Sequence, residues 1–142
     1  MKALTIHPLF ACGIAFGLKT IELRTWKTDF RGDIIITSSS KKLHDTIPGH
    51  ALCIAELHDI RKAQLSDVRA AMTRTTQIDP ETDYAWLLRN IRLIKPVPIK
   101  GRLSLWNCDL QPEIIMTLDE YLSLSDEEDE KVFNQYWASL YV

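Results

Sequence analysis

A short alternating segment, followed by a turn and three consecutive isoleucines, constrains the fold of this chain most strongly. Within residues 19–26 (KTIELRTW), Ile21 and Leu23 alternate with polar residues, as in a strand with one buried face. Residues 30–33 (FRGD) have the composition of a turn, and the triple isoleucine at 34–36 is suited to a buried strand. The chain is therefore expected to be organised around a sheet.

The polar face of the first predicted strand gathers charges of both signs. Thr20, Glu22 and Arg24 are expected on one side of the strand, with Lys19 at its entrance. A solvated edge strand would show the same pattern. A lysine just after a helix also interacts favourably with the helix dipole, and Lys19, Glu22 and Arg24 could form a purely structural charge network. The pattern does not distinguish these structural roles from a role in lining a ligand-binding cleft.

The rest of the body predicts short strands around a small number of helices. We expect strands at 3–6, 51–57, 84–88, 91–95 and 103–106, and helical segments at 9–16 and 65–73. Gly17 is expected to end the first helix, Arg89 and Asn90 to form a turn, and residues 73–83 to form an exposed flap. This mixture predicts an α+β fold: a small mixed β-barrel with flanking helices.

The last thirty residues change to a helical period. Residues 117–120 and 125–128 are two capping boxes, each of which predicts the start of a helix. A stripe of apolar residues follows at helical spacing: Val132, Phe133, Tyr136, Trp137, Leu140 and Tyr141. We expect residues 1–110 to form the barrel domain and 111–142 an acidic helical extension packed on it. A dimer contact, or a contact with a protein partner, is the alternative use of this helix.

The charge distribution favours an anionic partner. Residues 1–110 carry 16 Lys and Arg against 11 Asp and Glu, whereas residues 111–142 carry one against eight. A basic body suits nucleic acid, although the excess is modest. No run approaches the ~18 apolar residues of a membrane span, and the first residues lack a signal-peptide pattern. Three widely spaced cysteines fit a reducing compartment, so a cytoplasmic protein without metal or cofactor is expected.

Several residues are candidates for binding a nucleic acid. The segment after the triple isoleucine supplies the hydroxyls of Ser38 and Ser39 and the charge of Lys41, which can receive a phosphate. Arg31 lies before the predicted strand of the triple isoleucine and adds a further cation. Trp26 follows the charged strand and could stack on a base, or belong to the core.

The separated motifs together resemble the ASCH domain, the activating-signal-cointegrator homology module of the PUA-like superfamily. The resemblance spans roughly residues 3–109 and rests on 19–26 (KTIELRTW), Arg31-Gly32, 37–39 (TSS), Tyr84-Ala85-Trp86 before Arg89-Asn90, and Lys100-Gly101 before Leu105-Trp106. It implies a pseudo-barrel of five or six strands whose cleft, beside the early helix, is lined by Lys19, Glu22 and Arg24. Arg89 and Lys100 join the candidate binding residues through these motifs.

The resemblance implies two classes of function. The first is binding of single-stranded RNA or a modified nucleotide. The alternative is a hydrolase, either a ribonuclease or an enzyme that removes the acetyl group of acetylated cytidine with a lysine, a threonine three residues later and a distant glutamate. Here Lys19 matches that lysine and Glu22 stands at the threonine's place. Glu22 could act as a general base while Lys19 and Arg24 stabilise a phosphate or oxyanion.

Overall fold

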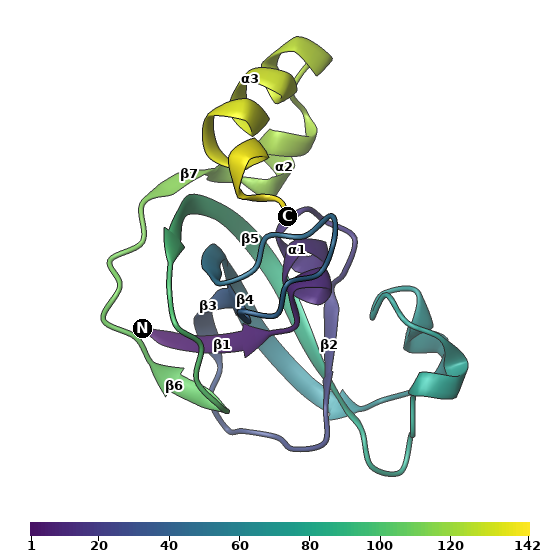
Figure 1. Ribbon diagram of the computed structural model, residues 1–142. Coiled ribbons are helices and arrows are strands. Elements are labelled where there is room, and N and C mark those ends of the chain that lie inside the picture. Colours follow the sequence, from purple (N-terminus) through teal and green to yellow (C-terminus); the bar gives the residue numbers. More distant parts are fainter.

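The computed structural model describes residues 1–142 and shows a curled sheet that wraps around helix α1, with α2 and α3 projecting at one end (Figure 1). The seven strands are β1 (Lys2–Ile6), β2 (Ile21–Arg24), β3 (Gly32–Ser38), β4 (His50–Lys62), β5 (Tyr84–Pro98), β6 (Leu105–Asn107) and β7 (Ile114–Thr117). Their hydrogen-bonded order is β2-β5-β4-β3-β1-β6, and β7 pairs with β5 beyond the end of β2. Only β1 and β3 run parallel. The predicted α+β class, with the strands in one curled, barrel-like sheet, is confirmed.

The predicted turn at Arg89 and Asn90 is wrong, because both residues lie inside the single strand β5. Asn90 has a φ of 54°, a left-handed conformation that asparagine tolerates better than most residues. The pairing of β5 with β4 shifts register between Ile54 and Glu56, opposite this point. The strand therefore bends at a bulge instead of reversing, and a polar dipeptide between two apolar runs looks the same in either case.

Helix α1 (Pro8–Ala15) begins and ends as the sequence indicates. His7 precedes it, and the Nδ1 atom of His7 accepts a hydrogen bond from the amide of Leu9 at 3.2 Å. Proline fits the first helical position because its nitrogen has no hydrogen to donate. Gly17 follows the helix with a φ of 89°, which an L side chain rarely adopts. The chain then turns directly into β2, and this turn carries Lys19.

The predicted helix at 65–73 is much shorter in the structure. Only a 3₁₀ turn, η1 (Leu65–Val68), forms there, and a second, η2 (Thr75–Gln77), follows in the expected flap. The carboxylate of Asp67 accepts hydrogen bonds from Arg61 and from the amide of Gln64, which fixes the start of the turn. Met72 has a φ of 57°, so the segment turns back toward the sheet there instead of continuing as a helix.

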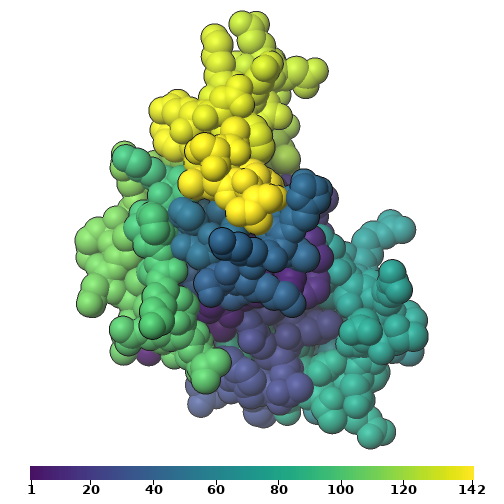
Figure 2. All heavy atoms as spheres, in the orientation of Figure 1, coloured from purple at the N-terminus to yellow at the C-terminus, as the bar shows by residue number.

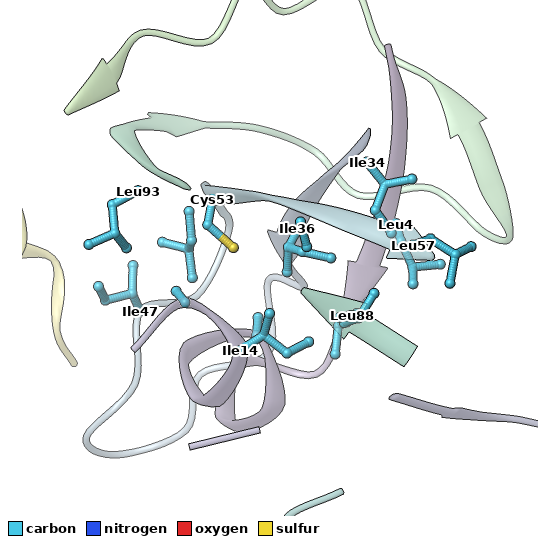
Figure 3. Packing of buried hydrophobic residues seen from close by; sticks show 14 of the residues in the cluster. Leu4, Ile14, Ile34, Ile36, Ile47, Cys53, Leu57, Leu88 and Leu93 are labelled. Atoms are coloured by element: carbon cyan, nitrogen blue, oxygen red, sulfur yellow. The ribbon is translucent and has the colours of Figure 1, made fainter. Parts of the chain in front are cut away.

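The core lies between the inner face of the sheet and α1. Ile14 of α1 faces Ile36 of β3, Leu57 of β4 and Leu88 of β5 (Figure 3). Each of these side chains is almost completely buried. The charged and polar residues described below lie where this core opens at the ends of β1 and β2.

The acidic tail forms two helices, α2 (Leu118–Leu122) and α3 (Asp126–Tyr136), at the two predicted capping boxes. A 3₁₀ turn, η3 (Ala138–Leu140), follows α3. Trp137 is fully buried in the main core and meets Phe16 of the α1 cap edge to face, with ring centroids 5.2 Å apart. Figure 2 shows the tail, in yellow, seated on the segment near residue 45, where Val142 and Thr46 share a backbone hydrogen bond. The division at residue 110 stays a prediction. None of the helices has the length and hydrophobicity needed to cross a lipid bilayer.

Candidate nucleotide-binding cleft

A pocket of about 280 Å³ opens where the end of β1, the start of α1, strand β2 and the segment before η2 meet. Lys19, Glu22 and Arg24 all line it. The other lining residues are Ile6, His7, Phe10, Leu23, Ala71, Thr73 and Gln77. The charged residues that were predicted on one strand and at its entrance thus line the same pocket.

Glu22 lies between two cations at the wall of this pocket. Its Oε1 is 3.3 Å from the Nζ of Lys19, and its Oε2 is 3.0 Å from the Nη2 of Arg24. Lys19 also donates a 2.6 Å hydrogen bond to the carbonyl of Ala71 and lies 4.6 Å from the ring centroid of Phe10. Lys19 and Glu22 are only 3% and 5% exposed. Burial lowers the pKa of Lys19 from its ordinary value, while the carboxylate of Glu22 partly opposes this change.

Arg24 is the most exposed member of the cluster. A quarter of its side chain reaches solvent, and Nη2 also donates to the carbonyl of Thr5 at 3.2 Å. Its Nε is buried and has no hydrogen-bond partner. Because a buried donor without an acceptor is costly, this guanidinium retains capacity for a further interaction.

A second hollow of about 400 Å³ adjoins the first. The two share Ile6, His7 and Arg24. The remaining wall of the second hollow consists of Thr5, Ser39, Ser40 and the loop from Lys100 to Ser104. The predicted residues Ser39 and Lys100 therefore lie beside the cleft. Lys41 is close enough for its charge to lower the pKa of His7, an effect second to that of burial.

The family model described as ASCH domain matches residues 4–100, more than half of the chain. The chain belongs to the ASCH domain family.

Similar solved structures support the fold of this ASCH domain. The crystal structure of ASCH from Zymomonas mobilis superposes with a TM-score of 0.60 at 18% identity, covering 95% of this chain and 94% of that one. A tyrosine-to-phenylalanine variant of that protein gives a TM-score of 0.59 at 18% identity, covering 95% and 97%. A serine-to-alanine variant gives 0.53 at 19% identity, covering 95% of both chains. At this level of identity the likeness concerns the fold alone. Comparison with curated proteins finds no match.

The ASCH domain does not bring Trp26, Arg31, Ser38 and Arg89 into either hollow. Each of these side chains has another contact within the protein. Trp26 packs against the buried Trp86, with ring centroids 4.7 Å apart. Arg31 donates to the carbonyls of Thr28 and Phe30, Ser38 to the carbonyl of His50, and Arg89 to the carboxylate of Glu56. A sequence pattern places such residues near a strand end but does not reveal these competing partners.

The expected place of Thr20 is also wrong. Strand β2 begins only at Ile21, and the amides of Thr20 and Ile21 both donate to the carbonyl of Ala70. Thr20 is exposed and lines a different pocket, beside Asn90 and Thr117. The alternation of the strand therefore does not extend back to it.

Several residues of the cleft were missed by the sequence analysis. His7 could have been noticed as the residue that caps α1 before Pro8. Thr73 and Gln77 come from the irregular segment between β4 and β5, for which no periodic signal exists. Arg102 follows Lys100 by two residues, and this spacing was an available signal. No three or more His, Cys, Asp or Glu side chains are grouped to hold a metal ion.

Proposed function

We propose that this ASCH domain binds single-stranded RNA, or a modified nucleotide, in the cleft formed by Lys19, Glu22 and Arg24. The observation that carries the proposal is that two buried charged side chains, Lys19 and Glu22, and the partly exposed Arg24 form the wall of one pocket. Burying ion pairs costs desolvation energy, and apolar residues of similar size often stabilise a fold at least as well. Charges retained at this position are best explained by a charged or strongly polar ligand.

The cleft offers the contacts that a nucleobase requires. The carboxylate of Glu22 can accept a hydrogen bond from an exocyclic amine, as acidic side chains do with cytosine. Thr73 and Gln77, which line the same pocket, supply a hydroxyl and an amide that can both donate and accept. The ring of Phe10 provides an apolar surface beside them.

The surrounding cations would hold the phosphate backbone. Arg24, Ser39, Lys41 and Lys100 lie in or beside the two hollows. The four predicted residues outside the hollows would be reached only by a longer strand: Trp26, Arg31, Ser38 and Arg89. Location in the cytoplasm and a protein contact or dimer contact through α3 also stay proposals.

Binding is tested with a fluorescently labelled single-stranded RNA of about eight nucleotides, within the usual site size of such proteins. Lys19→Met removes the charge but keeps the aliphatic stem against Phe10, and Arg24→Gln removes the second cation. Each is expected to weaken binding about tenfold, the effect of losing one charge-assisted hydrogen bond. Arg92→Gln is the matched control, because Arg92 is also paired with a carboxylate in the sheet but lies outside the cleft.

Thermal unfolding identifies any variant that is not folded. Wild-type affinity in both folded cleft variants would contradict the proposal. Loss of affinity in the Arg92 control equal to that in Arg24→Gln would also contradict it, since binding would then follow total charge.

A hydrolytic activity at the same cleft is the second candidate, and the lowered pKa of the buried Lys19 favours it. A lysine that loses its proton more easily can act as a base, and Glu22, 3.3 Å away, can exchange that proton with it. Turnover of RNA or of acetylated cytidine should then disappear in Glu22→Gln and remain in Glu56→Gln, a glutamate outside the cleft. Absence of product at stoichiometric protein with both substrates would exclude this candidate.

A further inference from the structure

The charged residues that line the second hollow are all cations. Arg24, Lys100 and Arg102 line it, and no Asp or Glu does. Neither Lys100 nor Arg102 forms an ion pair, whereas Arg31, Arg61, Arg89 and Arg92 elsewhere in the body each lie within 4.0 Å of a carboxylate. The charges of Lys100 and Arg102 are thus available to an anion from outside, beside the paired Arg24.

The loop that carries Lys100 and Arg102 is fastened to strand β1 through one threonine. The hydroxyl of Thr5 accepts hydrogen bonds from the amide of Arg102 and from the indole of Trp106, both at 3.2 Å. Gly101 packs so closely on Thr5 that any Cβ would overlap the threonine's side chain. The guanidinium of Arg102 lies 5.5 Å from the ring centroid of Trp106. These contacts hold the backbone of the loop and place the Arg102 guanidinium before any ligand arrives, which lowers the entropic cost of binding.

Arg24 connects this hollow to the cleft. It forms part of the wall of both, its Nη2 contacts Glu22 on the cleft side, and its buried Nε lacks a partner. A group that is neutral and rich in hydrogen-bonding atoms suits the cleft, where a carboxylate faces the ligand. A group with negative charge suits the second hollow, where no carboxylate faces the ligand.

We propose that the hollow of Arg24, Lys100 and Arg102 is a phosphate subsite next to the base-binding cleft, so that the ligand is a phosphodiester-linked strand and not a free nucleoside. This inference rests on the proposed function and assigns a different role to each hollow. The cleft supplies the interaction with the base, and the second hollow supplies most of the additional affinity that a phosphate brings. The hydroxyls of Ser39 and Ser40 lie in the same wall and can donate to phosphate oxygens.

The inference is tested by the affinity that one phosphate adds. The four ribonucleosides, their 3′- and 5′-monophosphates and the corresponding dinucleotides compete with labelled RNA for the wild type and for Lys100→Ala/Arg102→Ala. For the wild type we expect at least one monophosphate to bind about tenfold more tightly than its nucleoside. In the double variant this ratio should fall to nearly one while nucleoside affinity stays unchanged. Both replaced side chains are exposed, so the fold is expected to be retained.

A second double variant, Lys95→Ala/Arg69→Ala, removes the same charge at exposed positions outside both hollows and should keep the wild-type ratio. The subsite is overturned if Lys100→Ala/Arg102→Ala keeps the tenfold ratio, or if both double variants lose it equally. If Lys19→Met still weakens RNA binding about tenfold in that case, only the subsite fails and the cleft stands. If the wild type binds neither RNA nor any nucleotide, both proposals fail.

Discussion

Two groups of ionic side chains show how a structural ion pair differs from the candidate binding site. Arg92 of β5 donates to both carboxylate oxygens of Asp33 in β3, at 2.6 and 2.8 Å, and the pair lies outside both hollows. Glu22, by contrast, has a separate cation on each oxygen, and one of these, Arg24, keeps a buried donor without an acceptor. The charges of Arg92 and Asp33 satisfy each other, whereas the cluster around Glu22 retains a donor that can interact with a ligand.

The largest expected effect is on stability. Glu22→Gln should lower the free energy of unfolding by about 3 kcal/mol, because it leaves two closely spaced cations without their carboxylate in a buried site. Asp33→Asn should lower it by about 1 kcal/mol or less, because Asp33 is 41% exposed and water screens its partner. Urea unfolding of the two variants measures both values. Equal losses would show that burial does not separate the two groups.

A smaller effect is expected when the loop of the second hollow is displaced. Gly101→Ala introduces a Cβ where Thr5 leaves no space, so the loop must move and carry Lys100 and Arg102 with it. We expect a loss of about 1–2 kcal/mol in stability, typical of overpacking, together with weaker RNA binding. Arg92→Gln, which breaks the ion pair of Arg92 with Asp33, should leave RNA binding unchanged. Fluorescence anisotropy and urea unfolding separate the two effects, and unchanged RNA affinity in folded Gly101→Ala would contradict the role of the loop.

The pH dependence of stability should have the same sign at Asp67, a carboxylate paired with Arg61 outside both hollows, and at Lys19, but opposite consequences at neutral pH. The hydrogen bond from Arg61 lowers the pKa of Asp67, so this carboxylate adds stability above the unfolded pKa of about 3.9, and the gain is lost as the pH falls through the folded value. Burial lowers the pKa of Lys19, so the charged lysine costs stability at pH 7, and the cost is relieved as the pH rises toward about 10.4.

Unfolding measured across this range should therefore show two differences. The advantage of the wild type over Asp67→Asn should disappear in acid. The stability of the wild type relative to Lys19→Met should increase as the pH rises through the lowered folded pKa of Lys19 toward about 10.4. A flat difference between wild type and Lys19→Met in alkali would show that Lys19 is not held in a desolvated site.

The smallest expected effect is a change in the titration midpoint of His7, which lines both hollows. Burial, and then the charge of Lys41, lowers the pKa of this imidazole, so its midpoint should fall below the ordinary value of about 6.5. Bound RNA would bring negative charge and should raise the midpoint. The half-buried His58 of β4, which lies outside both hollows, is the control, and its NMR ring signals should not change when RNA is added. No change in the His7 midpoint would argue against an anion at the junction of the hollows.

The sequence predicted the regular parts of the fold because their signals are local. The triple isoleucine, the capping boxes at Thr117 and Ser125, and Gly17 each specify a strand or a helix end through their own chemistry. The bend of β5 was misread because a left-handed Asn90 serves a bulge as well as a turn. The type of an element was thus easier to predict than whether two neighbouring segments form one continuous strand.

The candidate site was predictable only where it lies on one strand. Glu22 and Arg24 could be brought together from the alternation of β2. Thr73, Gln77 and Arg102 enter the hollows through tertiary contacts of irregular segments, which no periodicity reports. Trp26 was chosen by residue type and Arg89 through the motifs of the family resemblance, and the structure shows that each already has a partner.

The central claim, that the charges left unsatisfied mark the binding site, is tested most directly by an NMR shift map recorded with a short single-stranded RNA. We predict the largest amide and side-chain changes at His7, Arg24 and Arg102, including the Nε–H of Arg24 as it gains an acceptor. We predict little change at the Nε–H of Arg92, which stays paired with Asp33. Changes centred on Arg92 and Arg89, with the Arg24 signal unmoved, would contradict the account.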